Sequence, residues 1–554
     1  MATFVSIACA PAAPTSSVVG QERAESRPTR TLSVLVRNEP LDLTDSLSSR
    51  ANFAVAMFGS SLVKRDGGVA YPVLSSVPEL NTDTWRVSPD GRMETTYHLK
   101  PGLVWHDGQP LTAEDLVFGR QVTAARVQYG LSITSIGEYR AIDEVLATAP
   151  DVAVIRWRQP YTDAASPSLK PLPKHLLESA LERAASDPQA LGSHPYWTNE
   201  FIGLGPYRLS RWERGAFLEG SAFDQYVLGR PKIDRIVLSW SGDPNVTVSR
   251  LLSKDGHITL DIAVQFEQAV TLRREWNTTK EGVLILSPSE VRFVGSQLRP
   301  AHANPRAILD PRVRRASIAA IDRKAVADAM LEGEGLVAEN AALPSEPYYE
   351  ALDRLAAKHP YDLRRVEDLM RQAGFSRGAD GLYSSSDEGR FAPEVLGIAE
   401  GQEGKETTVI ADYFRSAGFD AQLRLVPSVQ IQSDDELKAT YPSWRTNYNS
   451  GSSPGKFYGP DIASPDNKWA GGNKIGWSNP EYDRLVEVWR SALDPNDGNQ
   501  AQIQIFKIIN DELPILPLYY NFTVVAHTAD LQGPKGAAPQ TTIYGNLHEW
   551  QWLK

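Results

Sequence analysis

The chain contains residue types that catalyse reactions or hold nucleotides, but not at the spacings that such chemistry needs. Its nine histidines include no His-Glu-x-x-His pair, and His98 and His106 each sit beside an apolar run, which favours packing over metal binding. The run Gly451 to Lys456 has one residue too few between its glycines for a phosphate loop and continues with Phe457, not Ser or Thr. Gly203-Leu-Gly-Pro-Tyr207 has too few glycines for a dinucleotide-binding turn. We therefore expect no catalytic residues, no cofactor and no metal site.

The composition excludes several classes of protein and of site. The chain has 554 residues, with 57 Lys+Arg against 68 Asp+Glu, a formal net charge of −11 and no long basic run, so we expect no nucleic-acid partner. No apolar stretch approaches the roughly 18–20 residues of a membrane-spanning helix. The single cysteine, Cys9, excludes an intrachain disulfide and a cysteine-based zinc cage.

Residues 1–30 are expected to form a signal remnant and a tether. The apolar run from Met1 ends at Ala8 and Cys9 and passes into the small-residue, proline-rich stretch 10–17, which cannot pack a core. An apolar run, a small residue, one cysteine and a linker are together similar to a bacterial lipoprotein signal, in which the cysteine is lipidated. Only eight residues and no Lys or Arg precede Cys9, so lipidation requires a fuller signal upstream.

From about residue 30 the sequence alternates between strand and helix patterns. Thr31–Val36, Ile233–Trp240 and Gly282–Leu286 are predicted to be strands. Asp243–Leu252 is predicted to be a capped helix, and Asp310–Met330 to be one helix that Asp310 caps. Leu513–Tyr520 and Thr523–Ala526 are predicted to be closing strands. This alternation favours a mixed α/β sheet.

One segment carries a specific series of motifs. A tryptophan precedes a Ser-x-Asp-Gly turn, then come a strand, a second Asp-Gly turn and a helix start that Thr112 can cap. The residues are Trp85–Gly91, Glu94–Leu99, Lys100–Gly108 and Leu111–Phe118. This segment closely resembles the signature of the family 5 extracellular solute-binding proteins, the peptide and nickel receptors of ABC importers.

The resemblance continues in order along the chain to about residue 552. Its further blocks are Pro171–Leu177, Phe201–Tyr207, Tyr226–Ile236, Asp310–Arg315 with Ala320–Arg323, Tyr361–Phe375 and Asn479–Asp483. A single such block is weak support for family membership. A colinear series of such blocks makes the probability of an accidental match very low.

Membership of this family implies an α/β, two-lobed, periplasmic-binding-protein-like fold (type II, cluster C) with an extra subdomain in lobe I. We expect residues 31–61, 191–286 and 510–554 to form the core of lobe I and residues 62–190 to form the extra subdomain. Residues 287–509 are expected to form lobe II. The chain would then cross between the lobes near 287 and 509.

The family also implies where a solute binds. In members that import free peptides, a Trp-x-x-Asp-Tyr segment of lobe II carries an aspartate that pairs with the peptide ammonium group. The matching residues here are Trp444-Arg-Thr-Asn447-Tyr448, with a neutral amide in place of the carboxylate. A charged hydrogen bond contributes about 1.5–3 kcal/mol against about 1 kcal/mol for a neutral one, so a free amine fits Asn447 less well.

Two interpretations of the ligand remain open. Another acid could supply the charge, and the ligand would then be a peptide or a related amine. The candidates are Glu39, which follows Asn38 after the first strand, Asp461 and Asp466. Alternatively the ligand is a neutral oligosaccharide, whose hydroxyls would bond Asn447 and whose faces would stack on aromatic rings. Trp444, Tyr448 and Trp469 are the candidate rings.

The resemblance implies the substrate-binding component of an ABC importer, which captures an oligopeptide or similar polar oligomer and delivers it to a permease and its ATPase. The protein is expected to be a monomer outside the cytoplasm, in the periplasm or on the cell surface, attached to a membrane only by the lipid on Cys9. An oligosaccharide receptor is the alternative within the family. A sensory or chaperone-like receptor, and a hydrolase on this scaffold, are alternatives from other classes.

Overall fold

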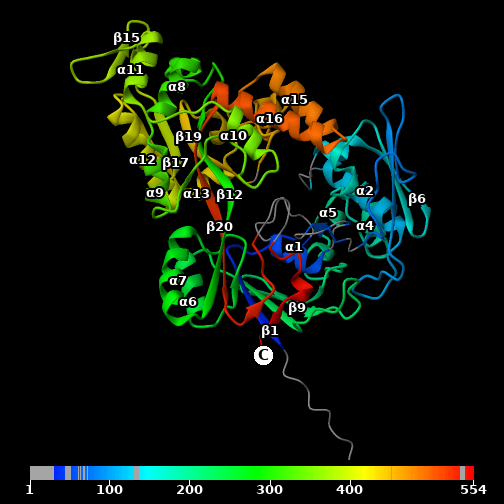
Figure 1. Ribbon diagram of the computed structural model, residues 1–554. Coiled ribbons are helices and arrows are strands. Elements are labelled where there is room, and N and C mark those ends of the chain that lie inside the picture. Colours follow the sequence, from blue (N-terminus) through cyan, green and yellow to red (C-terminus); the bar gives the residue numbers. More distant parts are fainter. Residues whose placement is uncertain are drawn as a thin grey trace, which may run out of the picture.

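The computed structural model describes residues 30–43, 52–59, 62, 64–65, 69–70, 73–129, 131, 136–450, 452–536 and 543–553. Cys9 and nearly all of the predicted tether lie outside these ranges, so its lipidation stays a prediction. The described chain forms two α/β lobes, one of which carries an extra subdomain (Figure 1).

One mixed sheet of eleven strands runs through both lobes. Its order is β18-β17-β19-β12-β20-β11-β1-β10-β9-β8, and β13 pairs with β20. The strands are β1 (Thr31–Val36), β8 (Tyr207–Glu213), β9 (Phe217–Ala222), β10 (Arg235–Trp240), β11 (Ile258–Thr259), β12 (Gly282–Ser296), β13 (Leu336–Val337), β17 (Glu394–Ile398), β18 (Gln422–Val426), β19 (Trp444–Ser450) and β20 (Ile515–Thr528).

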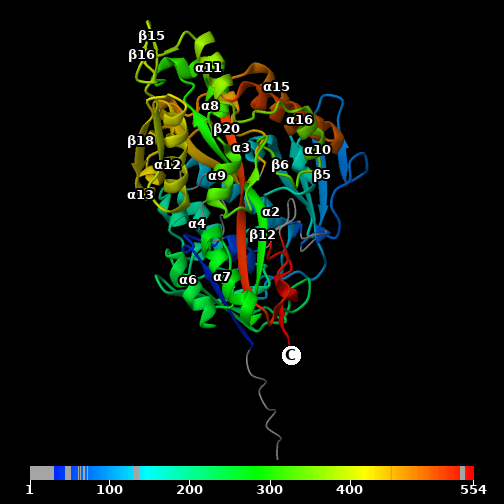
Figure 2. The same ribbon diagram turned by 60° about the vertical axis from the view of Figure 1, so that its left-hand side comes forward.

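Two long antiparallel strands join the lobes. β12 and β20 pair from Gly282 opposite Thr528 to Gly295 opposite Ile515. Figures 1 and 2 show this pair extending from the lobe that holds β1 into the lobe that holds β17 and β19. The chain before β12 builds the first lobe and its subdomain, and the chain between β12 and β20 builds the second. We call β12 and β20 the crossing strands, because both take part in the two halves of the sheet.

Lobe I packs helices on the half of the sheet that contains β1. The predicted strand Thr31–Val36 is confirmed, and the predicted helix after Asp243 is confirmed because the Asp243 carboxylate accepts from the Asn245 amide at 2.8 Å. The other elements of this part are α1 (Asn52–Phe58), α6 (Pro244–Leu252), α7 (Phe266–Thr279), β21 (Leu531–Gln532) and β22 (Gln551–Trp552). The chain after α1 forms the short pair β2 (Lys64–Arg65) and β3 (Val69–Ala70).

The extra subdomain has its own sheet and core. Its sheet order is β4-β5-β7-β6, and its buried cluster includes Tyr97, Trp105 and Trp157. The predicted cap is confirmed, because Thr112 and Asp115 form a reciprocal capping box at the start of α2. The elements between residues 85 and 184 are β4 (Trp85–Val87), β5 (Met93–His98), β6 (Ile142–Ala149), β7 (Val152–Trp157), α2 (Ala113–Gln128), α3 (Ile136–Ala141), α4 (Lys174–Ala184) and η1 (Thr162–Ala165). The next two, α5 (Gln189–Gly192) and η2 (Pro195–Trp197), place Leu191, Tyr196 and Trp197 in the core cluster that contains β1.

Lobe II surrounds the other half of the large sheet with helices. Besides β17, β18 and β19 it contains a small sheet, β14-β15-β16. Its elements are β14 (Ser376–Arg377), β15 (Tyr383–Ser385), β16 (Gly389–Arg390), α8 (Pro311–Ala319), α9 (Arg323–Met330), α10 (Tyr349–Leu355), α11 (Leu363–Gln372), α12 (Gly401–Ser416), α13 (Ser428–Ser433), α14 (Leu437–Thr440), α15 (Pro480–Ser491), α16 (Pro495–Glu512), η3 (Arg306–Leu309), η4 (Gly459–Asp461) and η5 (Pro465–Asn467).

The single helix predicted from Asp310 to Met330 is wrong. Two helices, α8 and α9, occupy this stretch. The Asp310 carboxylate caps the first by accepting from the Arg312 amide at 2.8 Å, and the Asp322 carboxylate caps the second by accepting from the Ala325 amide at 3.0 Å. The second cap lies in the middle of the apolar stripe and starts a new helix there.

The lobe boundaries predicted from the sequence stay a prediction, and the two crossing points fall in different kinds of structure. Residue 287 lies inside β12, whereas residue 509 lies inside α16, which packs on α15 and α10. The two predicted closing strands form one continuous strand, β20. We propose that the return crossing lies within β20.

Close packing of α12 on β17 provides a test of the lobe II architecture. A Cβ placed on Gly397 of β17 would lie 2.0 Å from Oγ1 of Thr407 on α12. Gly397→Ala is expected to lower the free energy of unfolding by about 1–3 kcal/mol because helix and strand must separate. Urea unfolding measures this, with Gly472→Ala as the control, since a Cβ there meets no atom within 4 Å. Equal effects of the two substitutions would contradict the packing.

Candidate functional site

The predicted ligand-binding segment is strand β19, beside the crossing strand β12. Asn447 pairs with Phe293 of β12, and Tyr448 pairs with Arg292. Because side chains alternate along a strand, Trp444 and Tyr448 share one face of the sheet and Asn447 lies on the other. The expected recognition residues are thus divided between two faces.

Trp444 belongs to the core of lobe II in this structure, so its contact with a ligand stays a prediction that the packing does not support. Its side chain is 0% exposed, and its ring lies 4.2 Å from that of Phe414 on α12, centroid to centroid. Phe391 and Phe419 complete the aromatic cluster. The sequence pattern could not separate this role from ligand stacking, because both need a large ring on the strand.

Asn447 and Tyr448 remain accessible, in different surroundings. Tyr448 is 40% exposed, with the Arg292 guanidinium carbon 5.4 Å from the centre of its ring. Asn447 is half-buried on the opposite face, and its Oδ1 accepts from the Tyr448 amide at 2.9 Å. The two donor hydrogens of the Asn447 amide group remain for other contacts.

The acidic candidate in lobe I already has partners. Glu39 accepts from the Trp212 indole at 3.1 Å and from the Gly215 amide at 3.1 Å, and Arg214 lies 3.6 Å from its carboxylate. Asn38, next to it, is half-buried. These Glu39 contacts all lie in lobe I, so the structure explains Glu39 without a solute.

The other candidates lie in the loop between β19 and α15. Asp461 ends η4 and is exposed, and Asp466 is exposed in η5. Trp469 is half-buried, with its ring 6.1 Å from that of His302. Asn473 fixes this loop by donating to the Phe457 carbonyl at 2.9 Å. The loop is held by its own contacts, and no contact of Asp461, Asp466 or Trp469 within the described residues reaches Asn447.

A buried ionic network beside β19 is a feature that the sequence patterns did not reveal. Arg292 is 3% exposed and donates to both carboxylate oxygens of Glu406 on α12, at 3.0 and 2.9 Å, and to Glu403 at 3.2 Å. Burial by itself lowers the pKa of the Arg292 guanidinium. The carboxylates of Glu406 and Glu403 outweigh this effect and raise the Arg292 pKa well above its usual value. Tyr519 of β20 also donates to Glu406. Both crossing strands are thus bonded to α12 of lobe II.

The lobes also touch on both sides of the crossing strands. On one side, Lys405 of α12 pairs with Glu267 of α7 at 3.0 Å, and the Phe266 ring stacks on that of Phe522. On the other side, α15 of lobe II contacts η1 of the subdomain, and Leu493 packs against the subdomain core. The described structure therefore has its lobes in mutual contact.

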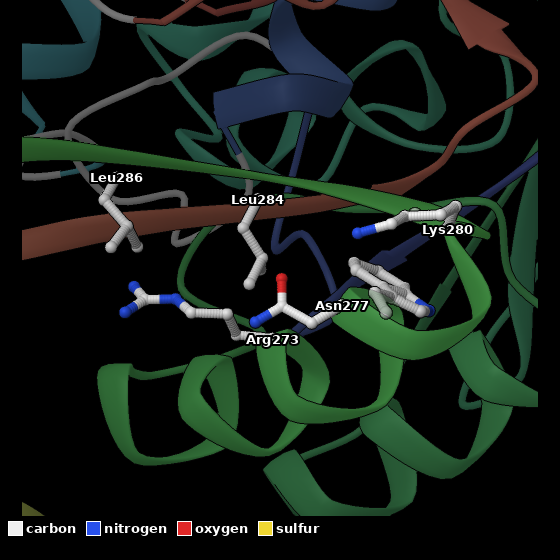
Figure 3. Close-up of a pocket in the computed structure, with 7 residues that line it drawn as sticks. Arg273, Asn277, Lys280, Leu284 and Leu286 are labelled. Carbon is white, nitrogen blue, oxygen red and sulfur yellow. The ribbon is translucent and has the colours of Figure 1, made fainter.

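A surface pocket of about 300 Å³ lies away from the predicted site. It is formed by α7 and the lobe I part of β12 (Figure 3). Its lining is Arg273, Trp276, Asn277, Lys280, Gly282, Leu284 and Leu286. None of the predicted site residues lines it, so it is not the expected solute site.

The described residues lack a side-chain cluster that could bind a metal ion, because no group of three or more His, Cys, Asp or Glu among them could hold one. His106 is packed: it accepts from the Gly203 amide, and burial lowers its pKa to about 4. No helix in the described ranges is long and apolar enough to cross a membrane.

The expectation that no residues have a catalytic spacing is wrong at one place, because Gly451-Ser-Ser-Pro-Gly455 matches the Gly-x-Ser-x-Gly spacing of a hydrolase nucleophile elbow. An elbow requires a sharp turn from a strand directly into a helix. Here Ser453 follows β19 but leads into turns, and the next helical element is η4, a 3-10 helix of three residues. The spacing therefore lacks the structural context that would place a nucleophile.

The Arg292 network provides a quantitative test of what ties the crossing strands to lobe II. Arg292→Met leaves Glu406, which is 0% exposed, without its countercharge and should cost about 3–5 kcal/mol in unfolding free energy. Arg156→Met, which removes exposed pairs with Glu94 and Glu144, is the control and should change stability little. Chemical denaturation measures both. An Arg292→Met effect no larger than the control would show that the pair does not stabilise the fold.

Comparisons with known proteins agree with this architecture. The chain is 24% identical over 477 residues to the oligopeptide-binding protein AppA of Bacillus subtilis, covering 84% of this chain and 81% of AppA. It is 23% identical to the glutathione-binding protein GsiB of Salmonella typhi, covering 89% of each chain.

Solved structures show the same fold. NikZ from Campylobacter jejuni, in complex with Ni(L-His), matches with a TM-score of 0.75 at 19% identity, covering 94% of this chain and 99% of NikZ. AppA from Bacillus subtilis, with a nonapeptide, matches with a TM-score of 0.73 at 20% identity, covering 95% of this chain and 100% of AppA. The sequence model of the bacterial extracellular solute-binding proteins, family 5, matches residues 76–469. The chain therefore belongs to the bacterial extracellular solute-binding proteins of family 5.

Proposed function

We propose that this protein is the substrate-binding component of an ABC importer, which captures an oligopeptide or similar polar oligomer between its lobes and delivers it to a membrane permease. The observation that carries the proposal is the strand pair β12–β20, which joins two lobes and has the accessible Asn447 on the neighbouring strand. Relatives described as oligopeptide- and glutathione-binding proteins support a peptide-like solute.

Binding alone is sufficient for this function. A solute that contacts both lobes only when they are together shifts the population towards that state by its differential affinity. A permease that recognises the closed form then distinguishes loaded from empty protein. The contacts of α7 with α12 and of α15 with η1 are arranged on both sides of the strand pair, as such a closed state requires.

The remaining parts of the proposal concern location and chemistry. The protein acts outside the cytoplasm as a monomer, held at a membrane by lipid on Cys9, and it releases its solute unaltered. Family membership supports the extracytoplasmic location. Burial of Trp444 removes one ring from those that could stack on a sugar, which favours the peptide over the oligosaccharide.

A thermal-shift screen tests the proposed function. Peptides of three to nine residues, oligosaccharides and nickel complexes are added to the full chain, and the melting temperature is measured. At least one peptide class should raise it, because a solute that binds only the folded protein stabilises it by mass action. Stabilisation by sugars alone would establish the oligosaccharide receptor. The absence of any stabilising solute, together with turnover of a chromogenic substrate, would refute the binding function.

Asn447 provides a sharper test of peptide recognition. Asn447→Asp restores a carboxylate to β19 and should raise the affinity for peptides with a free amine by roughly tenfold, because a charged hydrogen bond replaces a neutral one. Calorimetric titration with an amine-free and a free-amine peptide measures the difference. Asn245→Asp, at an exposed site on α6, is the matched control. Unchanged affinity in a protein that binds both peptides would remove Asn447 from the recognition site.

A further inference from the structure

A row of polar side chains lies on the face of β19 that carries Asn447. Alternation along the strand places Arg445, Asn447 and Asn449 on this face. Arg445 is 8% exposed and Asn449 is 5% exposed. Asn449 has a buried side-chain oxygen without a hydrogen-bond partner in the described structure. Two of the three residues are thus buried polar groups inside a protein lobe.

Arg445 is buried with its hydrogen bonds incomplete. Its Nη1 lies 3.4 Å from the Lys438 carbonyl, a long contact, and its buried Nε has no acceptor in the described part of the chain. None of the ion pairs formed by described residues includes Arg445. The edge of a guanidinium that carries Nε presents two parallel N–H groups, which match the two oxygens of a carboxylate or phosphate.

A second cation accompanies Arg445. Burial, and then the positive charges of Arg445 and Lys474, lower the pKa of the Lys456 amine, so these groups lie within electrostatic range of one another. Lys456 follows β19 and is half-buried. It too forms no ion pair with any carboxylate that the structure describes. Arg445 and Lys456 therefore repel each other in a partly dehydrated place.

The nearby carboxylates are already committed to other cations. Asp435 pairs with Lys438 and with Lys474, each at 3.0 Å. Glu403, which interacts electrostatically with Arg445, pairs with Arg292 at 3.2 Å. Buried unpaired charge is costly to a fold, so the buried Arg445 beside the half-buried Lys456 indicates a countercharge from outside the chain.

We infer that Arg445 and Lys456 form a subsite for an oxyanion of the solute, a carboxylate or a phosphate, with the side-chain N–H groups of Asn447 on the same face of β19. The inference rests on the proposed binding function and specifies it: the solute is anionic at this end. A neutral Asn447 is consistent with this charge, because an aspartate here would neutralise the cations.

Four probes of one length distinguish the charge and its source. They are N-acetyl-tetraalanine with a free carboxylate, its neutral C-terminal amide, tetraalanine amide with a free amine, and an N-acetyl peptide amide that carries phosphoserine. Titration calorimetry on the full chain should show the carboxylate or the phosphate probe binding at least tenfold more tightly than the neutral one. Preference for the carboxylate or the phosphate identifies the source, and equal binding of all four probes would overturn the inference.

Substitution of the two cations separates a binding role from a structural one. Arg445→Met with Lys456→Met should abolish the preference for the anionic probe and raise the melting temperature of the solute-free protein by about 2–4 °C, because two unpaired charges are removed. The control exchanges two exposed cations, Arg86→Met with Lys232→Met, and should leave both properties unchanged.

The outcomes distinguish this inference from the proposed function. If peptides bind but the preference survives the double substitution, the subsite is wrong and the binding function stands. If none of the four probes binds, the melting temperatures still decide: a lower value for the Arg445→Met, Lys456→Met protein would mean that the two cations stabilise the fold, which overturns the subsite. Failure of every solute in the screen would instead contradict the proposed function itself.

Discussion

The long pairing of β12 with β20 is the constraint on which the rest of this structure depends. The ladder extends from Gly282 to Gly295 and is interrupted by register shifts between Pro288 and Glu290 and between Arg292 and Phe293. A paired ladder resists separation, because each broken bond leaves a polar group unsatisfied. Motion of one lobe against the other therefore has to come from bending or twisting of this pair, and register shifts are where strands bend most readily.

Two buried arginines near this ladder differ in whether their charge is balanced within the chain. Arg292 is enclosed and bonded to Glu406 and Glu403, so its charge is balanced within the chain. Arg445 is enclosed nearly as well, yet its Nε has no acceptor among the described residues. The first ties β12 to α12, and the second is explained by our inference of an anionic solute.

Local sequence signals predicted local structure well. The strand Thr31–Val36 and the Thr112 cap depend on neighbouring residues, and both are confirmed. The break between α8 and α9 was missed because the apolar stripe continues across Asp322. The two-lobed fold followed from the family resemblance, since no periodicity reveals that β12 pairs with a strand more than 200 residues away.

The candidate site was predictable only in part. The motif identified residues 444–448 as the candidate segment, but it could not reveal that they form β19 or which face each side chain occupies, and Trp444 lies in the core. Arg292 and Glu406 are 114 residues apart, so their pairing has no local signature. Arg445 and Lys456 are ordinary surface residue types in sequence, and only their burial and their lack of carboxylate partners in the described structure distinguish them.

The central claim is that a bound solute holds the two lobes together across the β12–β20 pair. Its most direct test is the distance between spin labels introduced through Glu182→Cys on α4 and Arg484→Cys on α15, both exposed positions, in a Cys9→Ser background. The account predicts a broad distribution without solute and a single shorter distance when a stabilising solute is added. An unchanged distribution with a solute whose binding calorimetry has established would contradict it.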